Sequence, residues 1–217
     1  MRERYIKDLE AFTDQLAAMG VAVNEQVHKA VKSFQDVDAS VFAILDVEDK
    51  HINQMTNEIE KEAYRLIALQ QPVAEDLRLI FSILNASSDL ERIADHAVAI
   101  ARNVSRSETE KVDNLAQIID EMAMEATGML TDVMEAFAKK DKKAAEEIAN
   151  RDHKIDHGLK NLYRQSAKRM QHDSELVSSG INYLGIGNSL ERIGDYITNI
   201  CERIVYLSEA EIVELNQ

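Results

Sequence analysis

The pattern that decides the fold of this chain is a six-residue string that occurs twice, as LERIAD at residues 90–95 and as LERIGD at residues 190–195. The two copies differ only where an alanine is replaced by a glycine. Leucine, isoleucine and alanine at three- and four-residue steps are typical of the buried face of a helix. The string therefore predicts two related helices, each with a buried stripe bordered by carboxylates.

The similarity between the two copies extends through the chain in both directions. At a shift of 103 residues Phe34 aligns with Phe137, and beyond a longer turn at Pro72 the shift becomes 100. Two helical segments rich in alanine, glutamate and leucine can align by chance, but the shared string and matching turns argue against that alternative. We predict two tandem, sequence-related repeats, residues 1–105 and 106–217.

Each repeat divides into three long segments with helical periodicity. The chain has 7 glycines and 1 proline among 217 residues, too few for the frequent turns of an all-β protein. Helix breaks are predicted at 35–40, where Asp38 is a candidate N-cap, at Pro72 in the first turn of a third helix, at a 107–110 capping box, at Asp141 as N-cap, and at 172–175. The expected fold is all-α, with six long antiparallel helices in two three-helix bundles.

The composition and the pattern of apolar residues argue against several classes of protein. There are 39 acidic and 25 basic side chains, a net charge of -14, which disfavours binding to nucleic acid. The single cysteine excludes a disulfide scaffold and cysteine-based zinc or iron–sulfur sites. The N-terminus lacks the apolar stretch of a signal peptide, and no uncharged apolar run approaches the roughly 18–20 residues of a membrane span. We expect a soluble, cytoplasmic protein.

Carboxylates border the predicted buried stripe of the third helix. On a wheel of about 100° per residue, Ile93 faces the core while Glu91 and Asp95 share one flank. Arg92 and His96 fall on the other side of the helix. The flank therefore carries two acids one turn apart, beside the core.

The same arrangement recurs in the other helices. Glu191 and Asp195 share the flank of the sixth helix, where Glu202 continues it, and the fifth helix carries Asp152 and Asp156 at the same spacing. The second helix has Asp49 and Asn53 at the places that match this last pair. Three acidic pairs and one incomplete pair are therefore expected beside the core.

Acids at i, i+4 place two carboxylates about 6 Å apart, which is mildly destabilising on an exposed helix. The arrangement becomes favourable if a hard cation lies between them, and oxygen-only ligands suit Mg²⁺, Ca²⁺, Mn²⁺ or iron. The alternative is that these acids form surface salt bridges, each worth under roughly 1 kcal/mol. Their recurrence in both repeats strengthens the metal interpretation without deciding between it and surface pairing, and both stay open.

Other candidate motifs are weaker. EQVH at residues 25–28 and EDKH at 48–51 match the Glu-x-x-His unit of di-iron bundles, but neither recurs at the 103-residue shift. His153 and His157 form an i, i+4 pair farther from the apolar side, and we expect them to face solvent. Cys201 replaces a small apolar residue on a buried face, so we expect a thiol in the core.

No catalytic constellation is visible in the sequence. There is no glycine-rich phosphate loop, Walker sequence or Ser-His-Asp set. A metal-dependent enzyme that binds phosphate through cations stays open, although it needs an open coordination position and a group that activates a nucleophile. A structural bundle or chaperone-like dimer without metal also stays open.

Four strings together resemble the PhoU family of bacterial phosphate-transport and phosphate-signalling accessory proteins. They are SDLERIADH at 88–96, SLERIGDY at 189–196, QPVAEDLR at 71–78 and NICE at 199–202. The resemblance spans essentially the full chain and both repeats.

The resemblance implies multinuclear metal sites for iron, zinc, manganese or magnesium. By position, the implied ligands are Asp49, Glu91, Asp95, Asp152, Asp156, Glu191 and Asp195. The first site departs from the pattern because Asn53 stands where an acid is expected, so an amide oxygen replaces a charged ligand. We predict weaker metal binding in the first site.

The resemblance also implies a non-enzymatic role in regulation. A protein of this kind links the phosphate ABC transporter, through its ATPase subunit, to a sensor histidine kinase, and keeps the phosphate-starvation response off when phosphate is plentiful. It would be a cytoplasmic homodimer, peripheral to membrane complexes.

Overall fold

A computed structural model of the chain describes residues 2–106, 113–211 and 213–215. The described elements are α1 (Arg2–Asp36), α2 (Val41–Gln70), α3 (Ala74–Ser105), α4 (Asp113–Lys139), α5 (Lys142–Ala149), α6 (Asp152–His172), the 3₁₀ turn η1 (Ser174–Leu176) and α7 (Val177–Glu209). The predicted all-α fold is confirmed, and the described part of the chain contains no strand. None of its helices is long and apolar enough to cross a membrane.

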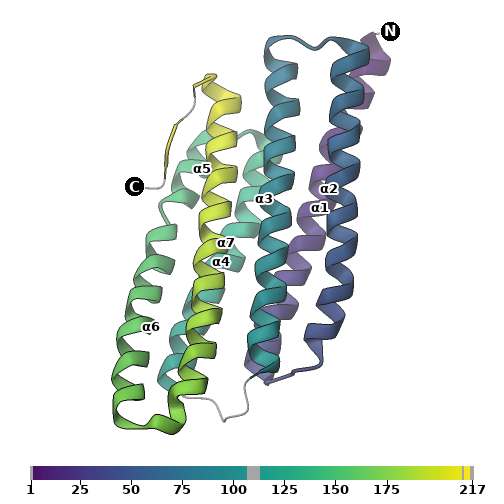
Figure 1. Ribbon diagram of the computed structural model, residues 1–217. Coiled ribbons are helices and arrows are strands. Elements are labelled where there is room, and N and C mark those ends of the chain that lie inside the picture. Colours follow the sequence, from purple (N-terminus) through teal and green to yellow (C-terminus); the bar gives the residue numbers. More distant parts are fainter. Residues whose placement is uncertain (1, 107–112, 212, 216–217) are drawn as a thin grey trace.

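The helices form two three-helix groups that stand side by side (Figure 1). One group contains α1, α2 and α3, and the other contains α4, the α5–α6 pair and α7. The most extensive helix contact in the molecule joins α3 to α7, so the two helices that carry the repeated string lie at the centre. Contacts between α1 and α4 close the other side of the junction between the two groups.

The interface between α3 and α7 is antiparallel. Asn182, near the start of α7, donates to the carbonyl of Arg106 at the end of α3, 3.4 Å away. Asn199, farther along α7, donates to Asp89, earlier in α3, at 3.3 Å. The two helices therefore run in opposite directions and cross near the repeated strings.

The hydrophobic core is continuous across both repeats. Every α-helix contributes residues to it, and they form one cluster that extends in sequence from Phe12 to Val205. Phe34 of α1 packs edge to face against Tyr183 of α7, with ring centroids 5.6 Å apart, and so joins the two groups. The buried stripe predicted for α3 is confirmed, because Ile93 and Ala94 are both fully buried.

The ends of the helices match most of the predicted breaks. Asp141 caps α5 as predicted, since its side chain accepts the N–H of Ala144. The prediction that Asp38 is an N-cap is wrong: Ser40 holds that position, and Asp38 accepts both the N–H and the hydroxyl of Ser40. Pro72 precedes α3 rather than lying in its first turn. The capping box predicted at 107–110 lies outside the described residues.

The fifth predicted helix is interrupted by a tight turn. The N–H of Arg151 bonds to the carbonyl of Ile148, three residues back, at 2.9 Å, and this turn separates α5 from α6. The Arg151 side chain reaches α4, where its guanidinium pairs with Glu125 and Asp132 at 2.5 Å each. The break places Asp152 at the start of α6, close to α7.

Candidate functional site

The first carboxylate cluster comprises Asp49 and Asn53 of α2 with Glu91 and Asp95 of α3. Burial raises the pKa of Asp49, and the nearby charge of Asp95 raises it further. The pKa of Glu91 is raised by burial and then by the charges of Asp95 and Asp49. These mutual effects show that residues about forty positions apart in the sequence have been brought together by the packing of α2 on α3.

The amide of Asn53 is already engaged within the first cluster. Its Nδ2 donates to Oδ2 of Asp49 at 3.1 Å, and this bond works against the rise in the pKa of Asp49. Oδ1 of Asp49 and Oδ1 of Asn53 are buried without a hydrogen-bond partner. Buried acceptors without a donor are costly and rare in proteins, so both oxygens are suited to receive a cation.

The second carboxylate cluster comprises Asp152 and Asp156 of α6 with Glu191 and Asp195 of α7. Asp152 is only 3% exposed. Burial, followed by the charges of Asp156, Asp195 and Glu191, raises its pKa to about 7. The pKa of Glu191 is also raised, first by burial and then by Asp195. The structure therefore gathers four acids where the first cluster has three.

Asp152 fits against α7 because residue 194 is a glycine. A Cβ atom at Gly194 would lie 2.1 Å from Oδ1 of Asp152 and 3.3 Å from its Cγ. The alanine found at the equivalent position of the first repeat would therefore displace this carboxylate. Oδ1 of Asp152 is buried and has no hydrogen-bond partner.

The charge of the second cluster is partly balanced by an arginine from within the repeated string. Arg192 approaches Asp195 at 3.1 Å through Nη1 and Glu191 at 3.5 Å through Nε. The carboxylates therefore point in part toward Arg192 rather than toward one another. Among the described residues, no three histidine, cysteine, aspartate or glutamate side chains converge where they could hold a metal ion.

The oxygen atoms of the two clusters nevertheless suit a hard cation as ligands. The first cluster offers carboxylate oxygens and one amide oxygen, the second offers carboxylate oxygens only, and each contains at least one buried oxygen without a hydrogen-bond partner. Glu191 and Asp195 are partly exposed side chains, and their charges already act on Asp152. Positive charge placed among these acids would relieve the repulsion that raises their pKa values.

Several other sequence predictions can be placed in the structure. Glu202, expected to continue the acidic flank, accepts the backbone N–H of Leu215 at 2.9 Å. His153 is exposed, as expected. Glu48 pairs with Lys29 at 2.5 Å and His51 is exposed, so the di-iron alternative gains no support there. Cys201 is fully buried, and burial raises the pKa of its thiol to about 12.

Sequence reasoning missed a buried carboxylate at the centre of the molecule. Asp89 is 7% exposed and lies between the two repeats, where Asn199 donates to it. Burial raises the pKa of Asp89 to about 6, although Asn199, Arg203 and Arg92 oppose the rise. Its equivalent, Ser189, carries no charge, so the repeat gave no signal at this position.

Sequence reasoning placed Arg92 and His96 on the far side of their helix but did not predict what that side contacts. Both contact α7: the guanidinium of Arg92 lies 5.5 Å from the centroid of the Tyr196 ring, and the His96 ring stacks on it at 5.8 Å. The far side of α3 with respect to its own bundle is the side that meets the other repeat. A wheel drawn for one helix cannot distinguish such a surface from one that faces solvent.

A duplicated helical bundle with paired carboxylate clusters defines the class of this protein, and comparison with known proteins identifies the family. The family model described as "PhoU domain" matches twice, at residues 16–104 and 119–204. The chain belongs to the PhoU family. The resemblance stated from the sequence is therefore confirmed.

Relatives match over nearly the whole chain. A phosphate-specific transport system accessory protein PhoU homolog of Clostridium acetobutylicum is 34% identical over 216 residues, 99% of each chain. The phosphate-specific transport system accessory protein PhoU of Escherichia coli is 33% identical over 199 residues, 92% of this chain and 83% of that protein. The family is thus one of accessory proteins of phosphate transport.

Solved structures share the same fold. The crystal structure of the phosphate transport system regulatory protein PhoU from Streptococcus pneumoniae superposes with a TM-score of 0.89 at 33% identity, covering 96% of this chain and 99% of that one. PhoU from Pseudomonas aeruginosa gives the same TM-score and identity, covering 95% of this chain and 100% of that one.

Proposed function

We propose that this protein is a non-enzymatic, metal-binding regulator of phosphate uptake and of the phosphate-starvation two-component response. The observation that carries the proposal is the pair of carboxylate clusters, which the two repeats build at equivalent places beside the core. The names of its relatives, accessory and regulatory proteins of phosphate transport, support the same role.

The proposed metal ligands are the seven acids predicted from the sequence. Asp49, Glu91 and Asp95 would serve the first site, and the four acids of the second cluster would serve the second. Iron, manganese, magnesium or zinc are the candidate ions, with oxygen ligation favouring the first three. A bound cation would supply positive charge between two helices, and the chain itself provides the buried oxygens that receive it.

Metal content tests this part of the proposal. Protein purified without chelator should carry metal by mass spectrometry, and Glu191→Gln should lower the amount per chain. Glu147→Gln is a matched control, because Glu147 is an exposed acid that pairs only with Lys143 of its own helix in the described contacts, at 3.5 Å. Equal metal content in both variants, or none in the wild type after incubation with Mn²⁺ or Fe²⁺, would contradict metal binding here.

We further propose that the protein acts as a cytoplasmic adaptor and negative regulator when phosphate is plentiful. Its partners would be the ATPase subunit of the phosphate ABC transporter and the sensor histidine kinase of the phosphate regulon, and it would act as a homodimer. A net charge of -14 suits docking to protein partners rather than to nucleic acid.

Co-purification from the native cell tests the adaptor role. A tagged copy, isolated in mild detergent from cells grown with ample phosphate, should bring down both the transporter ATPase and the kinase. Recovery of neither partner under these conditions, with the tagged copy still restoring a deletion strain, would argue against the adaptor.

The absence of catalysis can be tested separately. Protein loaded with Mg²⁺ or Mn²⁺ should hydrolyse phosphomonoesters and nucleotides no faster than buffer. Turnover that disappears in Glu191→Gln but survives in Glu147→Gln would replace the regulator with a metal-dependent enzyme.

A further inference from the structure

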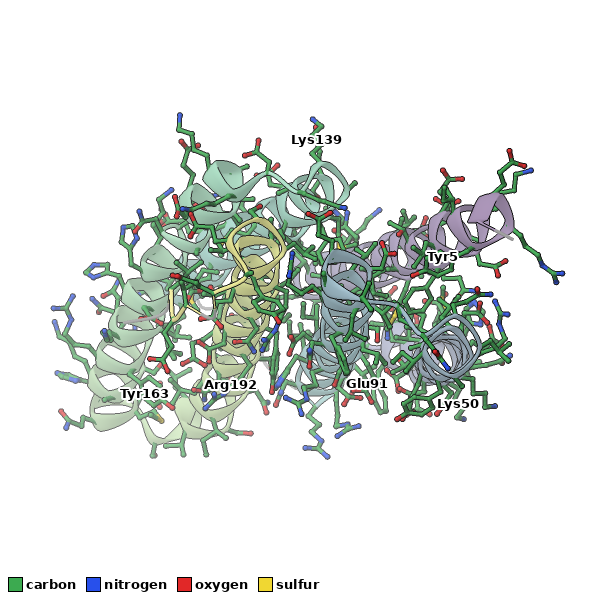
Figure 2. The ribbon with its side chains drawn as sticks, turned by 90° about the horizontal axis from the view of Figure 1, so that it is seen from above. Tyr5, Lys50, Glu91, Lys139, Tyr163 and Arg192 are labelled. Atoms are coloured by element: carbon green, nitrogen blue, oxygen red, sulfur yellow. The ribbon has the colours of Figure 1, made fainter. Side chains whose placement is uncertain are left out.

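Between the two carboxylate clusters lies a small group of cationic and aromatic side chains, Arg92 and His96 of α3 with Arg192 and Tyr196 of α7, which we call the α3–α7 seam. Positions 92 and 192 are equivalent in the two repeats, as are 96 and 196. The seam therefore draws equivalent positions from both repeats. Figure 2 shows Glu91 and Arg192 toward the same side of the molecule, and Lys139 at the opposite edge.

Tyr196 holds the α3 side of the seam in place. The guanidinium of Arg92 lies over its ring, 5.5 Å from the centroid, and the His96 ring stacks on it at 5.8 Å with 30° between the planes. Contacts of this kind orient a guanidinium while leaving its N–H groups available at the edge. Arg92 is exposed, so those groups can reach a ligand from solvent.

Arg192 supplies a second guanidinium from the other repeat. Its side chain is 58% exposed, and it lies close enough to His96 for its charge to act on that ring. Two arginines of equivalent position thus flank one histidine and one tyrosine at the surface. Each arginine also has acids beside it: the charge of Arg92 acts on Glu91 and Asp89, and Arg192 pairs with Glu191 and Asp195.

We propose that the α3–α7 seam binds an oxyanion of the phosphate type, either inorganic phosphate or the phosphoryl group of a lipid head. Two planar guanidinium forks can each present paired N–H donors to tetrahedral oxygens, which is the geometry arginine uses to recognise phosphate. The ring of His96 and the hydroxyl of Tyr196 are polar groups of the same seam that can add hydrogen bonds.

Binding at the seam competes with the acids on either side. Arg192 now pairs with Glu191 and Asp195, and these carboxylates would repel an anion. A cation taken up by the second cluster would engage the carboxylates and release Arg192 toward the seam. This coupling rests on the metal binding proposed above, and by linkage phosphate would strengthen cation binding by the same factor.

Calorimetric titration of the full-length protein with inorganic phosphate tests the seam. With Mg²⁺ present we expect phosphate affinity to rise about tenfold over the chelator-treated protein. Arg92→Gln should weaken phosphate binding in Mg²⁺ by about tenfold or more, the usual effect of losing hydrogen bonds to a charged group. Arg92→Lys should fall between the two, because lysine keeps the charge but not the fork.

The matched control is Lys139→Gln, which removes one positive charge at an exposed site on the far edge of the molecule. It should leave phosphate affinity unchanged. Free-phosphate binding that is equal in Arg92→Gln and Lys139→Gln would mean that inorganic phosphate sits on bound metal or on no defined site. It would exclude inorganic phosphate as the ligand of the seam, and without Arg92-dependent binding to vesicles it would overturn the seam. Mg²⁺ binding is titrated alone beforehand, so that its absence contradicts the proposed metal sites independently of the outcome at the seam.

A vesicle arm distinguishes the two sources of phosphate. Vesicles of phosphatidylcholine with phosphatidylglycerol are sedimented with wild type, Arg92→Gln and Lys139→Gln protein. Binding that depends on Arg92 for vesicles but not for free phosphate assigns the seam to a lipid head group, and the reverse assigns it to inorganic phosphate. Binding of neither probe in an Arg92-dependent manner overturns the proposal.

Discussion

The first and second carboxylate clusters occupy equivalent places in the two repeats, yet they satisfy their acids differently. In the first, Asn53 donates a hydrogen bond to Asp49 at 3.1 Å and lowers the local negative charge. In the second, Asp156 takes the place of that amide, Asp152 is nearly inaccessible, and its pKa rises to about 7. One cluster is stabilised by an internal amide, and the other retains a repulsion that a cation would relieve.

The glycine at 194 extends the same contrast. Ala94 occupies its place in the first repeat, and only the glycine leaves room for a carboxylate against the central helix. The two clusters therefore differ at two pairs of equivalent positions, 53 and 156, and 94 and 194. These differences leave little repulsion between carboxylates in the first cluster and strong repulsion in the second. Each can be exchanged between the repeats.

Exchanging the amide position should have the largest effect. Asp156→Asn should weaken the binding of Mn²⁺ to the second cluster about 10- to 100-fold, because a charged ligand becomes a neutral one. Asp49→Ala, which removes an acid from the first cluster, should cause a smaller loss of bound metal. The measurement is metal titration followed by mass spectrometry of the retained ions.

The reciprocal change, Asn53→Asp, should strengthen metal binding by the first cluster. Comparison of Glu147→Gln with the wild type gives the effect on metal binding of changing one charge outside the clusters. Equal metal loss in Asp156→Asn and Asp49→Ala would contradict the predicted difference in metal affinity between the two sites.

The pH dependence of stability should come next in size. The pKa of Asp152 is raised when the protein folds, so its contribution is fully present below the unfolded pKa of about 4 and is lost as pH rises through about 7. Metal-free protein should therefore lose stability between pH 5 and pH 8, with Asp152 accounting for about 2 kcal/mol.

Urea unfolding in chelator at the two pH values measures that loss. Asp152→Asn should reduce the slope more than Asp49→Asn does, since the first cluster already has an amide donor. Identical slopes in the wild type and Asp152→Asn would show that this carboxylate stays solvated.

Exchanging the small residue, Gly194 for alanine, should have the smallest effect on the free energy of unfolding. Whether the protein is stabilised or destabilised shows which of two opposing contributions is larger. Alanine favours a helix over glycine by about 1 kcal/mol, whereas overpacking a buried site costs about 1–3 kcal/mol. Gly194→Ala should therefore destabilise metal-free protein by about 1 kcal/mol, because the new Cβ displaces Asp152.

Thermal or urea unfolding of Gly194→Ala and of Ala94→Gly measures both directions of this exchange. A stabilised Gly194→Ala would mean that helix propensity prevails and that Asp152 is not held against α7.

Much of the fold could be predicted because its signals are local. The spacing of Leu90, Ile93 and Ala94 fixes the buried face of a helix within a single turn, and the cap at Asp141 acts over three residues. The break at Arg151 was not predicted, and the partners that hold the Arg151 side chain lie on α4, 19 and 26 residues away. Asp89 was also missed, since its partner Asn199 is 110 residues away.

By itself, the sequence determined that the chain is helical, that it is duplicated, that acids border each buried stripe, and that Asn53 leaves one acid missing. These properties follow from periodicity and residue type, which act over one or two helical turns. Only the tertiary structure decided which acids meet, that Gly194 admits Asp152, and that Arg92 and His96 face the other repeat. Those outcomes depend on how side-chain volumes of distant helices fit together, and helical periodicity carries no information about that register.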